Sequence, residues 1–214
     1  MNRIAYVLGA VLCAAVAAHA ADTIEVFGHK WTVFNKADWN ITQEDGSAVL
    51  DLVTPREPLP GPRRPIQFAV ADTPDFDKVT VTADVKPLKR SLIFVFAYRD
   101  AAHFDYAHLS TDTATKQPVH NGVFHVYGGE RVRISSPEGP AAFPQLGRWY
   151  RAELHWNGNT GTVEVSVDGK NIPALHAVDL SLRSGKVGLG SFNETADFKN
   201  VKIEGTQTVR RTDQ

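Results

Sequence analysis

The stretch Lys78-Val79-Thr80-Val81-Thr82-Ala83-Asp84-Val85 decides the fold class, because apolar and polar side chains alternate along its length. Successive side chains of a β-strand point to opposite faces, so a period of two predicts a strand with one face on a core. The same alternation recurs over residues 148–156 and 162–167. Turn residues occupy 157–161 between them and 168–169 after them. These segments predict antiparallel strands joined by short turns.

The run at residues 92–97 (LIFVFA) lacks alternation and predicts a central strand that is covered on both faces. No segment shows the period of an amphipathic helix. A series of short strands of this kind is typical of an all-β protein, a two-sheet antiparallel β-sandwich or jelly roll. The further strands that we expect lie at residues 31–35, 47–53, 66–71, 92–99, 104–110, 122–127, 130–135, 186–192 and 198–204.

Two stretches predict long loops. Residues 54–65 contain five prolines, which remove donors from a strand ladder and favour an extended loop. Residues 135–147 (SSPEGPAAFPQLG) predict a second loop. The polar residues 206–214 predict a flexible tail. With the first 20 residues expected to be a signal peptide, as described next, the sandwich domain is expected to span residues 21–205.

The first 20 residues have the parts of a secretory signal peptide. Arg3 supplies positive charge, residues 4–18 are almost wholly apolar, and Ala18-His19-Ala20 places small residues where a signal peptidase cleaves. The apolar run is shorter than the roughly 20 residues of a membrane span. We therefore expect cleavage after Ala20, a secreted or periplasmic location and no membrane span.

Composition narrows the classes of partner. The chain has 23 Lys and Arg against 24 Asp and Glu, a formal net charge of −1, which gives no general attraction to nucleic acid. Cleavage after Ala20 would remove Arg3 and the single cysteine, Cys13. The domain would then hold no disulfide, and its stability would come from its core.

Several segments together resemble one superfamily. Trp39-Asn40-Ile41 with the following turn resembles an opening hairpin, and Val167-Asp168-Gly169 resembles the end of a strand–loop–strand unit. Residues 92–110 resemble a central strand pair, and 185–203 resemble closing strands. The chain thus resembles the concanavalin A-like lectin/glucanase superfamily, in particular its laminin-G-like and keto-disaccharide-hydrolase-like bacterial members. This resemblance implies the sandwich fold and a polysaccharide or glycoconjugate partner.

The resemblance does not extend to the superfamily's catalytic motifs. The Glu-x-Asp-x-x-Glu motif of its glucanases is missing, and so are the signatures of the keto-disaccharide hydrolases. Retaining hydrolysis needs two carboxyl groups about 5 Å apart. The carboxylates of the central strands, Asp100, Asp105 and Glu130, are isolated in the sequence. A standard glucanase is therefore not expected, and catalytic residues stay unassigned.

The one chemical cluster lies between residues 99 and 133, where four histidines fall within 23 residues. Along 104–110, Tyr106 and His108 share a face, which is compatible with either His120 or the pair His125 and Tyr127 across the next strand. We predict that Tyr106 and His108 share a face with His125 and Tyr127, together with Arg131, Arg133 or both. His120 and Asn121 are expected to enter from a loop. The predicted ligand-binding residues are Arg99, Tyr106, His108, His120, Asn121, His125, Tyr127, Arg131 and Arg133.

This cluster supports three interpretations. It is a polar exposed sheet face, a carbohydrate-binding face on which tyrosines stack against sugar rings, or a polysaccharide lyase site. A lyase needs a neutraliser for the uronate carboxylate, a base and an acid, for which Arg or Asn, His or Tyr, and Tyr are suited. We favour a secreted carbohydrate-binding or accessory domain. The alternatives are a lyase or atypical glycoside-processing enzyme, and an envelope interaction protein without a sugar ligand.

Metal binding is expected to be structural if it occurs. His120 and His125 are five residues apart, which on a strand places them on opposite faces and argues against a shared zinc ion. Asn193, Glu194 and Asp197 lie in a segment before the last expected strand and offer oxygen ligands for a structural calcium ion. No other cofactor is expected.

Overall fold

The computed structural model describes residues 21–208. The expected signal peptide and residues 209–214 of the expected tail lie outside this range. Within it, two antiparallel sheets and two 3-10 helices, η1 (Lys36–Asp38) and η2 (Pro173–Leu175), account for the regular structure. No helix among these residues has the length and apolar character that a membrane crossing requires.

Sheet A contains most of the strands that bear the predicted site. Its neighbouring strands are all antiparallel. In spatial order they are β1 (Asp22–Val26), β2 (His29–Val33), β5 (Gln67–Ala71), β15 (Lys186–Ser191), β7 (Ser91–Asp100), β8 (His103–Ser110), β9 (Gly122–Tyr127) and β10 (Glu130–Arg133).

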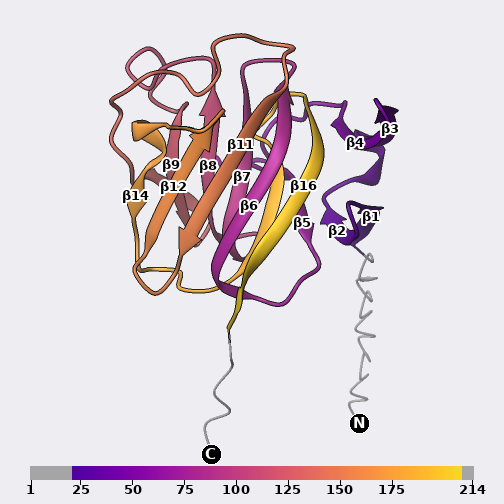
Figure 1. The fold of residues 1–214 in the computed structure, drawn as a ribbon. Coiled ribbons are helices and arrows are strands. Elements are labelled where there is room, and N and C mark those ends of the chain that lie inside the picture. Colours follow the sequence, from indigo (N-terminus) through magenta and orange to yellow (C-terminus); the bar gives the residue numbers. More distant parts are fainter. Residues whose placement is uncertain (1–20, 209–214) are drawn as a thin grey trace, which may run out of the picture.

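Sheet B packs face to face with sheet A, and Figure 1 shows its central strands in front of β7, β8 and β9. The short strand β14 (Ala177–Val178) adds to β12 beside the main path. In spatial order the other strands are β13 (Lys170–Asn171), β12 (Thr162–Val167), β11 (Tyr150–Asn157), β6 (Phe76–Pro87), β16 (Ala196–Gln207), β4 (Ser47–Leu52) and β3 (Trp39–Glu44).

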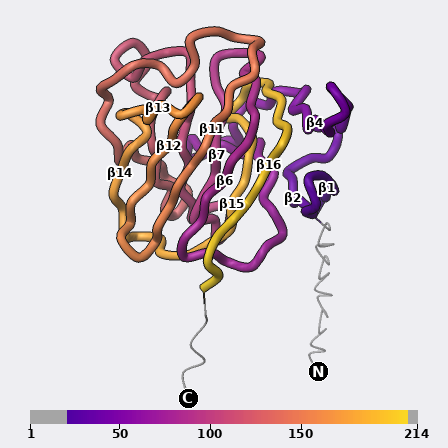
Figure 2. The backbone as a smooth tube through the Cα atoms, viewed as in Figure 1, coloured from indigo at the N-terminus to yellow at the C-terminus, as the bar shows by residue number. Residues whose placement is uncertain are grey.

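The main hydrophobic core fills the space between the sheets. Alternating residues such as Val81 of β6 and Leu154 of β11 point into it, opposite Phe94 and Phe96 of β7. Figure 2 shows β1, β2 and β4 along one side of the molecule and β12, β13 and β14 along the other. The predicted fold class, a two-sheet antiparallel β-sandwich of the jelly-roll type, is confirmed.

Element boundaries follow the predictions closely, with a few differences. β16 runs to Gln207, two residues past the expected end of the domain, because Thr206 and Gln207 still pair with β6. β1 was not predicted, since its sequence DTIEV is short and half polar. Its Ile24 and Val26 are buried nonetheless.

Strand β7 is covered on both faces, as predicted from residues 92–97. Leu92, Phe94 and Phe96 belong to the core between the sheets, while Ile93 and Val95 belong to a second apolar cluster on the opposite face of sheet A. A strand of this kind cannot have a solvated face. The loops of the chain must therefore cover this second face, which we call the outer face.

A β-bulge in β7 reverses the direction of its side chains after Phe96. Ala97 has a φ of 50°, in the left-handed region, and its side chain joins the core as that of Phe96 does. Three residue steps from Val95 to Tyr98 oppose two steps on β15. The extra residue turns the Tyr98 side chain toward the outer face, whereas strict alternation would have placed it in the core.

The two predicted loops pack against different parts of the sandwich. The loop of residues 54–65 is tied at its start, where Arg56 Nε donates to Asp38 Oδ2 at 2.5 Å. It is tied near its end by Arg64 Nε, which donates to the Ala101 carbonyl at 2.8 Å across the outer face. The loop of residues 135–147 instead inserts Phe143 into the main core.

The bulge requires a glycine at position 185, because the backbone of Gly185 packs directly against that of Ala97 and Tyr98. A Cβ atom at Gly185 would lie 2.3 Å from the Ala97 carbonyl carbon and 2.6 Å from Tyr98 N. We expect Gly185→Ala to lower the free energy of unfolding by about 2 kcal/mol or more, because backbone atoms cannot move aside cheaply. Urea denaturation measures this change. Ser184→Ala is the control and should stay within about 0.5 kcal/mol of the parent; equal stabilities of the two variants would contradict the packing described.

Candidate functional site

The outer face of sheet A carries a cluster of aromatic and aliphatic side chains and most of the predicted site residues. All of its members except Tyr98 are buried, although they lie on the side of the sheet that faces away from the core. The cluster consists of Phe68, Val70, Ile93, Val95, Tyr98, Phe104, Tyr106, Phe124, Val126 and Phe192.

Tyr106 lies in the middle of this face, and the Arg131 side chain covers its hydroxyl. The Arg131 Nη1 donates to the Tyr106 hydroxyl at 3.0 Å, and its guanidinium lies 4.7 Å from the ring centre of Phe192. Burial raises the pKa of Tyr106 to about 12, against the opposing effect of the Arg131 charge. Tyr106 is fully buried. It therefore positions Arg131 and does not exchange protons near neutral pH.

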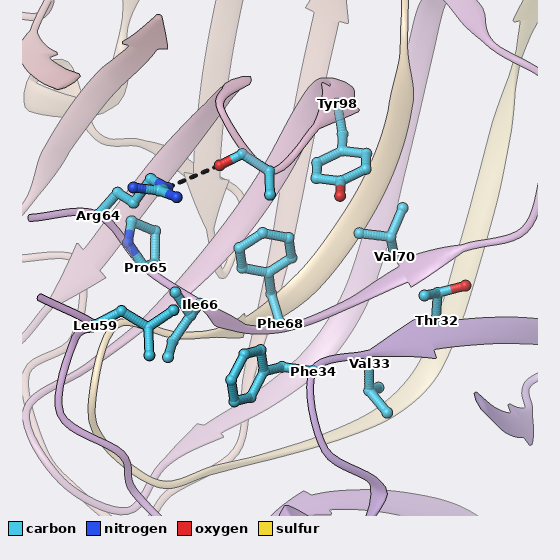
Figure 3. A pocket seen from close by; sticks show the side chains of 11 residues that line it. Thr32, Val33, Phe34, Leu59, Arg64, Pro65, Ile66, Phe68, Val70 and Tyr98 are labelled. Atoms are coloured by element: carbon cyan, nitrogen blue, oxygen red, sulfur yellow. Dashed lines mark hydrogen bonds between the residues drawn. The ribbon is translucent and has the colours of Figure 1, made fainter. Parts of the chain in front are cut away.

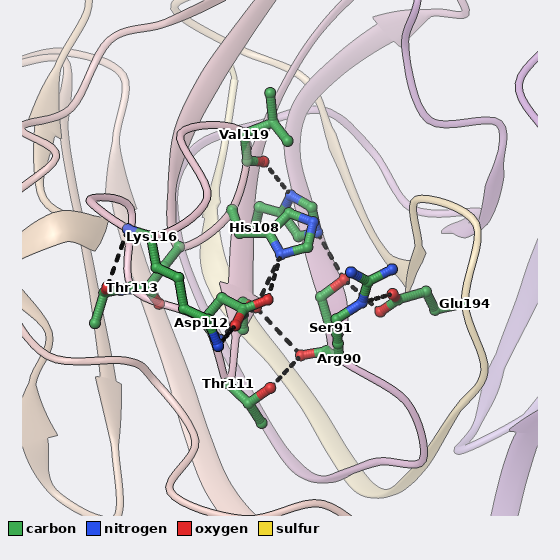
Figure 4. Close-up of polar contacts among 12 residues, drawn as sticks. Arg90, Ser91, His108, Thr111, Asp112, Thr113, Lys116, Val119 and Glu194 are labelled. Atoms are coloured by element: carbon green, nitrogen blue, oxygen red, sulfur yellow. Dashed lines mark hydrogen bonds and ion pairs between the residues drawn. The ribbon is translucent and has the colours of Figure 1, made fainter.

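His108 lies at one end of the outer face in a buried chain of polar contacts (Figure 4). Its Nδ1 lies 2.9 Å from the Val119 carbonyl oxygen, and its Nε2 lies 2.8 Å from the Ser91 hydroxyl. The Ser91 hydroxyl donates to Glu194 Oε2 at 2.8 Å, and Glu194 Oε1 accepts from Arg90 Nε at 3.1 Å. Burial, with the nearby His120, lowers the pKa of His108 to about 3. The imidazole is thus neutral in the folded protein.

His120 adjoins His108 and shares its surroundings, with 5.0 Å between the ring centres. Its Nδ1 lies 3.2 Å from the Ser110 hydroxyl and 3.4 Å from Asp112 Oδ2. Burial lowers the pKa of His120, although the carboxylates of Glu194 and Asp112 act in the opposite direction. The predicted neighbours Tyr106, His108 and His120 are therefore brought together on one face.

Arg133 and Asn121 hold loops in place. Arg133 Nη2 donates to the carbonyls of His120, at 2.5 Å, and of Pro118, at 3.1 Å. Its guanidinium passes directly over Gly122, where a Cβ atom would lie 2.0 Å from Nη1. Asn121 Nδ2 donates to the Pro140 carbonyl at 2.8 Å, which fixes the loop of residues 135–147. The side chains of Arg133 and Asn121 therefore form hydrogen bonds to loop carbonyls of the protein itself.

The predicted shared face of Tyr106, His108, His125 and Tyr127 is wrong. The register pairs His125 with Asp105 and Phe124 with Tyr106, so His125 and Tyr127 point to the opposite side of sheet A. There, His125 Nδ1 lies 2.6 Å from Asp105 Oδ1. Burial raises the pKa of Asp105 to about 6, and the hydrogen bond with Asp105 raises the pKa of His125. The His120 alternative is the one that the strand pairing supports.

At the expected calcium site of Asn193, Glu194 and Asp197, the two carboxylates form ion pairs. Glu194 binds Arg90 and the Ser91 hydroxyl, as described above. Asp197 Oδ2 lies 3.0 Å from Lys86 Nζ, which comes from β6. Each carboxylate is therefore paired with a cation of its own, and a calcium ion at this position stays a prediction.

A groove on the outer face surrounds Tyr98. On one side of its ring, an apolar cavity of about 200 Å³ is bounded by Phe68 of β5 and by Phe34 and Leu59 from loops. Figure 3 shows the Tyr98 hydroxyl pointing over Val70, with Arg64 and Pro65 of the proline-rich loop at the far end.

The other side of the Tyr98 ring borders a polar hollow of about 520 Å³. Arg99 and Lys186 line it, and Lys186 Nζ also lies 3.1 Å from Asp72 Oδ1. Burial raises the pKa of Tyr98, and the negative charge of the nearby Asp100 raises it further. The hydroxyl therefore stays protonated at neutral pH. Of the predicted site residues, only Arg99 lines this groove.

Tyr98 itself was missed because the bulge at Ala97 breaks the alternation on which the prediction relied. The signal in the sequence is weak. A tyrosine that directly follows the apolar run 92–97 reads as a further residue of the same buried strand. The glycine that makes the bulge possible, Gly185, lies 87 residues later in the chain.

Fold and groove together define a jelly-roll β-sandwich with an aromatic, partly charged groove on the outer face of one sheet. No protein-family model matches the chain, and no curated protein matches its sequence. Among solved structures, it is similar to the carbohydrate binding module CBM66 from Bacillus subtilis, with a TM-score of 0.58 and 16% identity over 82% of this chain and 95% of that one.

Two further solved structures show the same fold. One is a protein of unknown function with a galectin-like fold from Bacillus subtilis, with a TM-score of 0.51 and 18% identity over 80% of this chain and 88% of that one. The other is a putative glycosyl hydrolase from Parabacteroides distasonis ATCC 8503, with a TM-score of 0.51 and 15% identity over 82% of this chain and 98% of that one. At these identities the likeness concerns the fold alone.

The buried, neutral His108 predicts a loss of stability in acid. Its pKa is about 3 in the folded protein, whereas the unfolded chain takes up the proton near pH 6.5. The contribution of His108 is complete above about pH 6.5 and is lost as the pH falls toward about 3. We expect this group alone to lower the free energy of unfolding by about 2 kcal/mol between pH 7 and pH 5.

Urea denaturation at several pH values measures this dependence. His108→Gln should flatten it, because the proton uptake of the unfolded chain at this position disappears. His155→Gln is the control, since His155 is half exposed and lies on the outer side of sheet B. If His108→Gln keeps the pH dependence of the parent, the assignment of a neutral buried imidazole is wrong.

Proposed function

We propose that this chain is an exported carbohydrate-binding domain of the concanavalin A-like superfamily, which binds a polysaccharide or glycoconjugate in the groove around Tyr98. The observation that carries the proposal is the position of the Tyr98 ring between an apolar cavity and a polar hollow on one sheet face. The resemblance of the sequence and the carbohydrate binding module among structures of this fold support it. Export rests on the signal-like residues 1–20.

The groove has the two kinds of surface that a sugar ring presents. One face of a pyranose or furanose carries C–H groups that pack on an aromatic ring, and its rim carries hydroxyls that need hydrogen-bond partners. Tyr98 is held edge-on against Phe68, with 5.8 Å between ring centres and 73° between planes. Its orientation is therefore set before a ligand arrives, which lowers the entropy cost of binding.

Charge in the polar hollow favours a ligand with anionic groups. Arg99 and Lys186 line it together with Asp75. Arg99 Nε makes a single contact of 3.4 Å with the Ser184 carbonyl, and the other guanidinium nitrogens have no protein acceptor among the described residues. A guanidinium fork in this state suits a carboxylate or sulfate on a sugar. We therefore expect uronate-containing or sulfated glycans to bind more tightly than neutral ones.

The lyase alternative has less support. It requires the tyrosine, histidine and arginine of the cluster to meet a polymer, whereas Tyr106 and His108 are both at most 2% exposed. Arg133 is committed to loop carbonyls. Incubation with uronate polymers, followed by ultraviolet absorbance of an unsaturated product, tests this alternative in the same samples.

A glycan array followed by calorimetry tests the binding proposal. The parent chain should bind at least one glycan class, and Tyr98→Ala should weaken that binding at least tenfold through the loss of stacking. Arg99→Ala should weaken binding of anionic glycans more than that of neutral ones. Tyr127→Ala is the matched control, because this tyrosine is 60% exposed but lies on the other side of sheet A.

Two results would overturn the proposal. Absence of binding to every neutral and anionic glycan on the array would favour an envelope interaction protein without a sugar ligand. Equal losses from Tyr98→Ala and Tyr127→Ala would place the ligand elsewhere. Thermal unfolding of each variant shows that the comparisons concern folded protein.

A further inference from the structure

Three side chains with metal-binding groups converge at the open edge of the sandwich, on the opposite side of sheet A from the groove. Asp105 comes from β8 and His125 from β9, while Asp179 follows β14 of sheet B. One ligand atom from each lies within 4.8 Å of the other two. They form the one such group of three among residues 21–208. The cluster thus spans both sheets.

One ring nitrogen faces two carboxylate oxygens in this cluster. His125 Nδ1 lies 2.6 Å from Asp105 Oδ1 and 3.1 Å from Asp179 Oδ2. A ring nitrogen carries at most one hydrogen, and the geometry directs it to Asp105. Asp179 Oδ2 is left buried and without a hydrogen-bond partner. A buried carboxylate oxygen without a hydrogen bond carries a desolvation cost, which the charge of one shared imidazole offsets only in part.

The free oxygen of Asp179 is held in its position by its neighbours. The other oxygen, Oδ1, accepts from the backbone nitrogen of Ser181 at 3.0 Å and from its hydroxyl at 2.7 Å. The Asp179 backbone nitrogen donates to the Gly161 carbonyl at 3.0 Å. A Cβ atom at Gly161 would lie 2.4 Å from the Asp179 carbonyl oxygen, so this close approach requires a glycine. The carboxylate therefore presents Oδ2 to His125 in a fixed orientation.

The charge of the cluster is also unbalanced. Asp105 is 2% exposed, and no Lys or Arg of the described residues forms an ion pair with it or with Asp179. Their only ionisable partner is one imidazole. Buried carboxylates elsewhere differ, since Asp38 pairs with Arg56 and Glu194 pairs with Arg90. A divalent cation would supply the missing charge and bind the free oxygen.

We propose that Asp105, His125 and Asp179 form a binding site for a divalent transition-metal ion, with Zn²⁺ as the best match. Two carboxylates and one imidazole, whose Nδ1 releases its proton to solvent when the ion binds, suit this ion, whose bonds to nitrogen and oxygen are about 2.0–2.2 Å long. A tetrahedral centre spaces its ligand atoms about 3.4 Å apart. The distances of 3.1 Å and 2.6 Å from His125 Nδ1 to the two carboxylates differ from this value by less than about 1 Å, and the ligand atoms of Asp105 and Asp179 lie within 4.8 Å of each other.

The ion would link the two sheets at an edge where the described residues contain no cysteine. Asp105 and His125 would hold it from sheet A, and Asp179 from the segment after β14. Three protein ligands leave a fourth position for water or for an oxygen of a bound molecule. The site is independent of the proposed glycan groove, so either proposal can fail without the other.

Calorimetric titration of the metal-stripped full chain with ZnCl₂ tests the site. We expect one strong site per chain and a rise in Tm of about 5 °C at saturating Zn²⁺, because the ion binds the folded chain. Asp179→Asn should weaken binding at least tenfold while the Tm without metal stays near that of the parent. The amide retains the oxygen that accepts from Ser181 but removes the anionic ligand.

The matched control is His103→Gln, which removes another histidine beside an aspartate. His103 Nδ1 lies 2.9 Å from Asp100 Oδ1 at the turn between β7 and β8, and both side chains are at least partly exposed. This variant should bind Zn²⁺ as the parent does. The proposal is overturned if the parent binds Zn²⁺ no more tightly than about 100 µM, or if Asp179→Asn binds as tightly as the parent. Preference for Ca²⁺ over Zn²⁺ would overturn the assigned class of ion.

Discussion

The burial of β7 on both faces is the constraint on which the rest of this structure depends. Ile93 and Val95 lie on the outer face of sheet A, so the chain must cover an apolar surface that is separate from the main core. The loop of residues 54–65 and the guanidinium of Arg131 do so. Because Arg131 covers this face with a guanidinium, a buried hydrogen bond to the Tyr106 hydroxyl lies on the outer face. The groove around Tyr98 is where the cover is incomplete.

Strand register then divides the histidine-rich segment into two chemically different places. Tyr106 and His108 point outward into a buried network that contains both arginines and carboxylates, whereas Asp105 and His125 point inward, where carboxylates are the charged neighbours. Residues adjacent in the sequence therefore have different electrostatic environments. The pKa of His108 falls, whereas that of His125 rises. A single catalytic or binding centre that uses both imidazoles is not compatible with this arrangement.

Most of the fold could be predicted from the sequence, because alternation and turn residues are local signals. The strand at 92–97, covered on both faces, was also predictable, since its composition leaves no polar face. The site was less accessible. Whether His108 meets His120 or His125 depends on the pairing of β8 with β9. The direction of the Tyr98 side chain depends on a bulge that requires Gly185, which is distant in the sequence. Asp179 approaches Asp105 only through the packing of sheet B on sheet A. These are long-range relations that no local pattern contains.

The proline-rich segment 54–65 forms a wall of the groove without contributing a strand to either sheet. Its ends are held by Arg56 and Arg64, and its middle makes no ladder hydrogen bonds. Substitutions such as those at Leu59 can therefore change the shape of the groove with little effect on the sheets. In evolutionary terms, ligand preference in this architecture can diverge quickly while the scaffold stays constant. Proteins that share the fold at low identity would then be expected to differ first in this wall.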